Sequence, residues 1–184
     1  SGTAATESGL RLDGTFIQYQ PWMMELDADA WQRELEAMQQ AGLRTIVIQW
    51  LAHNDRTFIP QQADAVDPTE IILSFADRHG MEVVLGLYMD DDWWQWSPAG
   101  GLPERLVRRT RTIAEQAWSR YGRHGSFAGW YIPPEPADTL GPEAIPALKA
   151  FLRETSGLCR KLSGGKPVGF SPYLTGQLQA EVVE

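Results

Sequence analysis

One pattern repeats along the chain: a short run of β-forming residues, then a turn, then an amphipathic helical segment. Strands are expected at 15–20, 45–50, 83–88, 127–132 and 167–171, and helices at 29–41, 68–79, 103–121 and 142–162. Strands that alternate with helices in this way build a parallel sheet joined by right-handed crossovers. The chain is therefore predicted to belong to the α/β class.

The second helix has the clearest signals. Asp67 is a suitable N-cap, Pro68 suits the first helical position, and Glu70 can complete a capping box. Gly80 follows the last residue of the apolar pattern and predicts the helix end there. In the first helix, Asp29 is the residue expected to cap the N-terminus.

Two parallel architectures fit this alternation. A doubly wound sheet of five strands would be complete in 184 residues. A TIM barrel needs eight strand–helix units and about 250 residues. On that interpretation, residues 13–184 hold about the first five units of a (β/α)8 barrel and form a C-terminally incomplete domain, behind a flexible arm at 1–12. A fifth helix is expected to begin within 177–184.

The charge balance excludes several functions. Sixteen Lys and Arg against 24 Asp and Glu give a net charge of −8, which repels nucleic acid and anionic lipid. No apolar run approaches the roughly 20 residues that a membrane span needs, so membrane insertion is not expected. Cys159 is the only cysteine, which rules out a disulfide framework or a thiolate-rich metal site within one chain.

Sequence motifs for cofactors and nucleophilic catalysis are missing. His53, His79 and His124 fall at unrelated positions of the pattern, so no metal site is expected. No G-x-S-x-G motif is present, and no G-x-G-x-x-G follows the first strand. Lys166 follows two glycines but precedes a strand, whereas a P-loop lysine opens a helix. We therefore expect no cofactor.

Polar and aromatic residues gather where the predicted strands end. Functional residues of parallel α/β folds lie at the carboxyl ends of the strands. The candidates found there are Gln18, Gln49, Trp50, Tyr88, Asp90, Trp93, Trp94, Tyr131, Glu135 and Tyr173. Amides, carboxylates and flat aromatic rings suit the hydroxyls and apolar faces of sugars, and the chain has eight tryptophans. The sequence thus predicts a carbohydrate site at this end of the sheet.

Two segments carry the strongest candidates. Glu135 follows the fourth strand and lies between Pro134 and Pro136, which restrict the backbone and fix its carboxylate as a catalytic acid requires. A helix cap or an arginine partner is the simpler role for such a glutamate. In the 90–96 segment, Asp90 is a candidate second catalytic carboxylate facing Glu135, and Trp93 and Trp94 are candidates for stacking on sugar. An exposed acidic loop is the plainer interpretation.

Several short motifs occur in a familiar order. They are Gly14-Thr15-Phe16-Ile17-Gln18 with Trp31, then Ile46-Val47-Ile48-Gln49-Trp50, then Gly129-Trp130-Tyr131-Ile132-Pro133-Pro134-Glu135. From about Gly14 to Tyr173 the chain resembles a bacterial domain-of-unknown-function family of TIM-barrel type, which is similar to clan A glycoside hydrolases. The resemblance implies a (β/α)8 barrel that acts on a polysaccharide or oligosaccharide.

The resemblance also implies catalytic roles. In clan A the general acid/base is a glutamate just after the fourth strand, commonly preceded by Asn and followed by Pro, and Glu135 occupies that place. Pro134 stands where the asparagine would be. The clan's nucleophile follows the seventh strand, so the second carboxylate is expected beyond this chain.

Two functional hypotheses stay open from the sequence. One is a glycoside hydrolase in which Glu135 protonates the glycosidic oxygen. The other is a non-catalytic carbohydrate-binding or scaffold protein on the same fold. The opening residues resemble the start of a mature chain, so we expect a periplasmic or secreted location, although one cysteine is compatible with the cytoplasm too. If 184 residues were the complete folded unit, a dimer pairing the open sheet edges would be expected.

Overall fold

A computed structural model describes residues 12–62, 64–96 and 102–176. The strands are β1 (Gly14–Ile17), β2 (Thr45–Ile48), β3 (Ala52–His53), β4 (Arg56–Thr57), β5 (Glu82–Gly86), β6 (Tyr88–Met89), β7 (Phe127–Ile132) and β8 (Val168–Phe170). The α-helices are α1 (Ala28–Gln40), α2 (Pro68–His79), α3 (Glu104–Tyr121) and α4 (Ile145–Ser163). Two 3₁₀ helices are η1 (Pro21–Glu25) and η2 (Asp91–Gln95).

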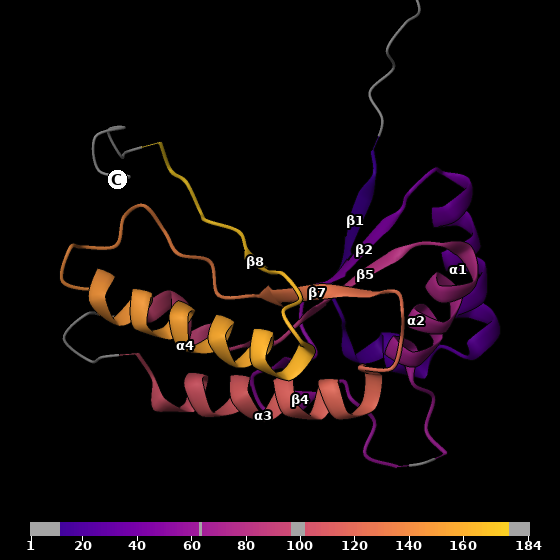
Figure 1. The fold of residues 1–184 in the computed structure, drawn as a ribbon, viewed down its shortest axis with the longest axis horizontal. Coiled ribbons are helices and arrows are strands. Elements are labelled where there is room, and N and C mark those ends of the chain that lie inside the picture. The colour runs from indigo at the N-terminus through magenta and orange to yellow at the C-terminus, as the bar shows by residue number, and fades with distance from the viewer. Residues whose placement is uncertain (1–11, 63, 97–101, 177–184) are drawn as a thin grey trace, which may run out of the picture.

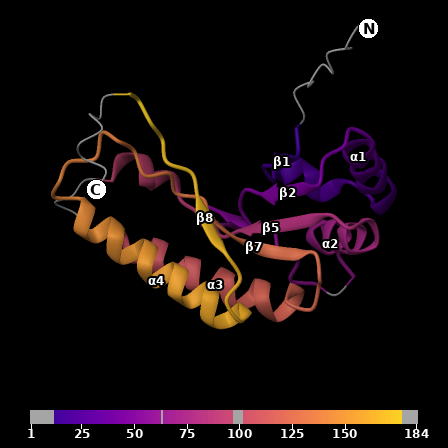
Figure 2. The ribbon, with the colours of Figure 1, turned by 45° about the horizontal axis from the view of Figure 1, so that its top comes forward.

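The order of the strands decides between the two predicted architectures. The main sheet runs β1-β2-β5-β7-β8, and every neighbouring pair is parallel. The order never reverses, so the sheet has no switch point of the kind that defines a doubly wound fold. Right-handed crossovers that always advance in one direction leave every helix on the same face. Figures 1 and 2 show this arrangement: a curved sheet with its helices on the outer, convex side. The predicted partial barrel is confirmed.

The hydrophobic core lies between the sheet and the helices. Along β2, Ile46 and Ile48 are fully buried while Val47 between them is half-buried. The same alternation continues in β5, where Val83 and Leu85 are fully buried. Side chains of a strand alternate between faces, so one set of residues packs against the helices and the other lines the concave face. That concave face carries part of the site described below.

The predicted helices agree with the structure to within one residue, except for the N-cap of α1 and the start of α4. Asp67 caps α2 by accepting a hydrogen bond from the backbone of Glu70, and Gly80 ends this helix in the left-handed conformation. Asp29 does not cap α1, because Asp27 does, accepting from the backbone of Ala30 at 2.7 Å. The prediction failed because two aspartates compete for one cap two residues apart.

The fourth helix begins three residues later than predicted. It starts at Ile145, so Pro142 lies in the preceding turn and Pro146 in the first helical turn. This places residues 135–144 in a long connection between β7 and α4. The predicted arm at 1–12 lies outside the described residues except for its last position, and so does the helix predicted within 177–184.

The third predicted strand is divided, and the second, predicted as 45–50, already ends at Ile48. The segment predicted as 83–88 forms β5 and then β6, and β6 pairs with β3 in a separate small sheet of order β4-β3-β6. Gly86 marks the break. A Cβ atom there would collide with the backbone carbonyls of Ile48 and Gln49. The ends of β2 and β5 therefore approach each other too closely at Gly86 to leave room for a side chain.

No helix in the described part of the chain is both long and apolar enough to span a bilayer.

Candidate functional site

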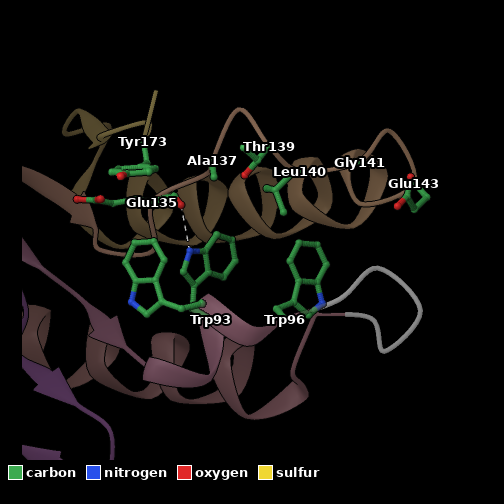
Figure 3. Close-up of a pocket in the computed structure, with 10 residues that line it drawn as sticks. Trp93, Trp96, Glu135, Ala137, Thr139, Leu140, Gly141, Glu143 and Tyr173 are labelled. Atoms are coloured by element: carbon green, nitrogen blue, oxygen red, sulfur yellow. Dashed lines mark hydrogen bonds between the residues drawn. The ribbon is translucent and has the colours of Figure 1, made fainter. Parts of the chain in front are cut away.

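Glu135 lies just beyond the carboxyl end of β7, at the edge of a cavity. Pro133 and Pro134 carry the chain from β7 to this residue, and both prolines are buried. Trp93 in η2 donates a hydrogen bond from its indole Nε1 to the backbone oxygen of Glu135 at 3.0 Å. The bond from Trp93 thus holds the backbone of Glu135 against η2 and does not involve the Glu135 side chain, which points away from the Trp93 ring (Figure 3).

We refer to this hollow as the aromatic cavity. Its volume is about 470 Å³, and it lies between η2 and the β7–α4 connection. Figure 3 shows it with Glu135 at one end and Glu143 at the other. The lining residues are Trp93, Trp94, Trp96, Glu135, Ala137, Thr139, Leu140, Gly141, Glu143 and Tyr173. A space of this size accommodates a ligand of one or a few rings.

The aromatic rings of the cavity divide into a fixed pair and an exposed pair. Trp93 and Trp96 stack with ring centroids 5.6 Å apart and planes 14° from parallel. Trp94 and Tyr173 meet edge to face at 6.5 Å, and their side chains are 55% and 53% exposed. Because about half of each of these two residues is exposed, their rings are accessible to a ligand.

The segment bearing Tyr173 is hydrogen-bonded to the β7–α4 connection. The Tyr173 backbone donates to Pro136 and accepts from Asp138, at 2.9 and 3.1 Å. The Asp138 carboxylate accepts from the backbone of Thr175 and Gly176 and from the Thr175 hydroxyl. Together these hydrogen bonds fix Tyr173 relative to the residues that immediately follow Glu135.

A second group of polar residues lies on the concave side of the sheet. Gln18 donates a side-chain hydrogen bond to Gln49 at 3.0 Å, which joins the ends of β1 and β2. Tyr131 packs edge to face on Phe16, with ring centroids 5.5 Å apart. Burial raises the pKa of Tyr131; a hydrogen bond with Ser171 opposes this, and the negative charge of Glu135 adds to it. Tyr131 therefore lies within electrostatic reach of the Glu135 carboxylate.

Asp90 lies beside the cavity but does not line it. Its side chain is almost fully buried, and Arg105 donates two hydrogen bonds to it, at 2.7 and 2.8 Å. The Tyr88 hydroxyl and the Asp92 backbone donate to it as well. Burial alone would raise the pKa of Asp90, but these hydrogen bonds and the charge of Arg105 outweigh burial and lower it. The carboxylate thus holds η2 and α3 together.

This arrangement predicts a pH-dependent contribution of Asp90 to stability. A carboxyl group whose pKa is lowered by folding stabilises the protein above its unfolded pKa of about 3.9, and this stabilisation is lost as the pH falls through the folded pKa. Asp90→Asn should therefore melt well below the wild type at pH 7, and the gap should narrow below about pH 4. Thermal denaturation of the two proteins between about pH 7 and pH 2.5 measures the difference in melting temperature and its change with pH.

Asp92→Asn is the matched control, because Asp92 contacts the same arginine from an exposed position. Its melting temperature should stay close to that of the wild type at neutral pH. An Asp90→Asn protein as stable as the wild type at neutral pH would contradict a structural role for this ion pair.

Two other candidates are buried away from the cavity. The Trp50 indole stacks on His53 and donates to the backbone oxygen of Tyr19 at 3.1 Å. The Tyr88 hydroxyl donates to Asp90, and burial together with this carboxylate raises the pKa of Tyr88 to about 12. Both rings belong to the packing beneath the carboxyl end of the sheet.

Of the ten candidates, the structure gathers four around the aromatic cavity: Trp93, Trp94, Glu135 and Tyr173. Gln18, Gln49 and Tyr131 share the concave face. Sequence reasoning did not select Glu143, because the predicted helix included it, whereas the structure leaves it in the turn before α4. Among the residues that the structure describes, no group of three or more His, Cys, Asp or Glu side chains could hold a metal ion.

Comparison with solved structures defines the class of this fold. The chain is similar to a candidate α-L-fucosidase from Bacteroides thetaiotaomicron, with a TM-score of 0.66 and 22% identity over 94% of this chain and 55% of the other. It is also similar to an endo-1,4-β-mannanase from Rhizomucor miehei, with a TM-score of 0.64 and 13% identity over 92% and 59%. The fold is that of the TIM-barrel glycoside hydrolases, and the chain spans little more than half of these relatives.

A third similar structure is a GH2 β-galacturonidase from Eisenbergiella tayi bound to galacturonate, with a TM-score of 0.60 and 14% identity over 89% of this chain and 26% of the other. Residues 12–183 match the model of a family described as a domain of unknown function, DUF4434. The chain belongs to that family. A comparison with curated proteins finds no match by sequence.

Proposed function

We propose that this domain binds an oligosaccharide or polysaccharide in the aromatic cavity and hydrolyses a glycosidic bond, with Glu135 as the general acid/base. One observation carries the proposal: a carboxylate directly after the fourth strand of the main sheet lies at the edge of a cavity lined by aromatic rings. Glycoside hydrolysis needs a positioned acid next to a sugar-binding surface.

The surroundings of Glu135 support the acid/base role. No described residue forms an ion pair with its side chain, so the carboxylate is available to a substrate. Its backbone is fixed by the bond from Trp93. Tyr131 lies close enough to sense its charge, and Gln18 and Gln49 present amides on the same concave face. These groups are suited to hydrogen-bonding sugar hydroxyls around the reacting bond.

Hydrolysis requires a second carboxylate, and Asp90 does not suit that role. Its two oxygens are occupied by Arg105, Tyr88 and the backbone of Asp92. We assign Asp90 to the positioning of η2, and through η2 to the positioning of Trp93. The second catalytic carboxylate is expected from strands of a complete barrel that these 184 residues do not include.

A binding protein without catalysis is the alternative, and the engagement of Asp90 is the observation in its favour. The two functions are separated by incubating the full-length protein with purified plant and bacterial polysaccharides and measuring reducing ends and bound sugar. Release of reducing ends supports the hydrolase. Binding without release supports the alternative, and neither binding nor release would overturn both.

Trp94→Ala is expected to weaken oligosaccharide binding about two- to tenfold, because it removes one exposed aromatic face worth about 0.5–1.5 kcal/mol. Its melting temperature should barely change, since the ring is 55% exposed. Trp22→Ala is the matched control: Trp22 is 57% exposed but lies outside the aromatic cavity. Isothermal titration calorimetry measures the oligosaccharide affinity of both variants. Equal losses of affinity in Trp94→Ala and Trp22→Ala would argue against stacking at Trp94.

Three further expectations remain predictions: a periplasmic or secreted location, a domain boundary at residue 13 and, if the 184 residues are the complete folded unit, a dimer through the open sheet edges.

A further inference from the structure

We propose that the aromatic cavity accepts uncharged and basic sugars and rejects acidic ones, and that Glu143 is a residue that determines this selectivity. The inference rests on the proposed carbohydrate function and specifies its substrate class. The fold leaves this class open, since one of the similar structures holds galacturonate, an acidic sugar.

The charges that line the cavity are of one sign. Glu135 and Glu143 are its two ionisable carboxylates, at opposite ends of the cavity (Figure 3), and none of the described lining residues is Lys, Arg or His. Residues 97–101, which follow Trp96 and lie outside the described part of the chain, are Ser, Pro, Ala and two Gly. Their side chains carry no ionisable group, so they add no charge to this balance.

Two basic side chains reach the carboxylates at and beside the start of η2 and form ion pairs with them. Arg105 binds Asp90 and Asp92 at 2.6 to 2.8 Å. His53 contacts Asp91 at 2.9 Å. Neither Arg105 nor His53 lines the cavity, so neither is placed to bind a sugar carboxylate there. An acidic sugar would lose part of its hydration in the cavity and gain no cation from the lining residues that the structure describes.

Glu143 lies against Gly141 at its end of the cavity. Its carboxylate lies over Gly141, and a Cβ atom on residue 141 would collide with both carboxylate oxygens. The absence of a side chain at 141 thus lets the carboxylate fold back over the cavity lining. Because Glu143 is exposed, its effect on a bound charge is partly screened and depends on salt.

Three tetrasaccharides with the same β-1,4-linked glucose backbone test the inference: cellotetraose, its C6-oxidised uronate form, and the 2-amino form. At low salt the protein should bind the amino form most tightly and the uronate form most weakly, with about two- to fivefold between successive members. Glu143→Gln should at least halve the ratio between the amino and uronate forms, and about 0.5 M NaCl should compress it in the wild type.

Glu115→Gln is the control, because it changes the net charge by the same amount as Glu143→Gln. Glu115 is exposed on α3 and does not line the cavity. It should leave the ratio unchanged. Equal affinity for the three sugars, or a ratio that Glu143→Gln does not alter, would overturn the selectivity while leaving carbohydrate binding intact.

A second readout needs no sugar. The fluorescence of Trp94 is taken as the difference between the wild type and Trp94→Phe, and its quenching by caesium and by iodide is divided by the quenching of free N-acetyltryptophanamide by the same ion. The normalised value should be higher for caesium than for iodide, and Glu143→Gln should bring the two values closer together. A normalised value for iodide equal to or above that for caesium would overturn the negative potential itself. If none of the three sugars binds, the result would overturn the selectivity and would also count against the proposed carbohydrate function.

Discussion

Glu135→Gln is expected to lower kcat for glycoside hydrolysis by about 10²–10⁴-fold, with little change in KM. Glutamine keeps the size and the hydrogen-bonding shape of the side chain but cannot give up a proton to the leaving oxygen. The backbone bond from Trp93 does not involve the carboxylate, so the loop should keep its place. Initial rates of reducing-end release by the full-length protein, on the substrate identified by the polysaccharide screen, measure the effect.

Two comparisons make this result decisive. Glu115→Gln removes an equal charge from α3 outside the cavity and should retain the wild-type rate. The melting temperature of Glu135→Gln should match that of the wild type, which excludes loss of fold as the cause. A Glu135→Gln protein that hydrolyses at the wild-type rate would remove Glu135 from the role of general acid.

Gly86→Ala is expected to destabilise the protein by about 3 kcal/mol, which is a large share of the roughly 5–15 kcal/mol that stabilises a typical domain. The new Cβ atom would collide with the backbone carbonyls of Ile48 and Gln49, and backbone cannot move aside as a flexible side chain can. The displacement would also reach the hydrogen bond between Gln18 and Gln49. Urea denaturation measures the loss of stability.

Gly157→Ala provides the opposite case in the same chain. Gly157 lies within α4, and a Cβ atom added there would point into open space and meet no other atom. Alanine favours a helix over glycine by about 1 kcal/mol, so this variant should be slightly more stable than the wild type. Equal effects of the two alanines would show that close approach at Gly86 is not what requires glycine there.

The alternation of strands and helices could be predicted from the sequence because apolar periodicity and end signals agree along most of the chain. Asp67, Pro68 and Gly80 bounded α2 correctly, since each satisfies a local requirement of a helix end. Phe127–Ile132 was predicted with the bounds that the structure has. These features depend on neighbours in sequence, which a single chain displays.

Features that depend on contacts distant in sequence could not be predicted. The break after Gly86 arises from the carbonyls of another strand. The engagement of Asp90 requires Arg105, fifteen residues away on the following helix, to reach back to it. Glu143 lines the cavity because α4 begins at Ile145 and not at Pro142 as predicted, and no local sequence signal distinguishes these two starting positions. The grouping of Glu135 with aromatic residues was predicted because parallel strands bring their ends to one edge.

The order of the main sheet also bears on how the chain acquires its structure during synthesis. Each strand of the main sheet pairs with the strand of that sheet that is synthesised before it, from β1 through β2, β5 and β7 to β8. Domains emerge from the ribosome with the N-terminus first. Each strand after β1 can therefore pair, as soon as it is synthesised, with a main-sheet strand that is already present. The sheet can grow at one edge without waiting for a segment later in the sequence.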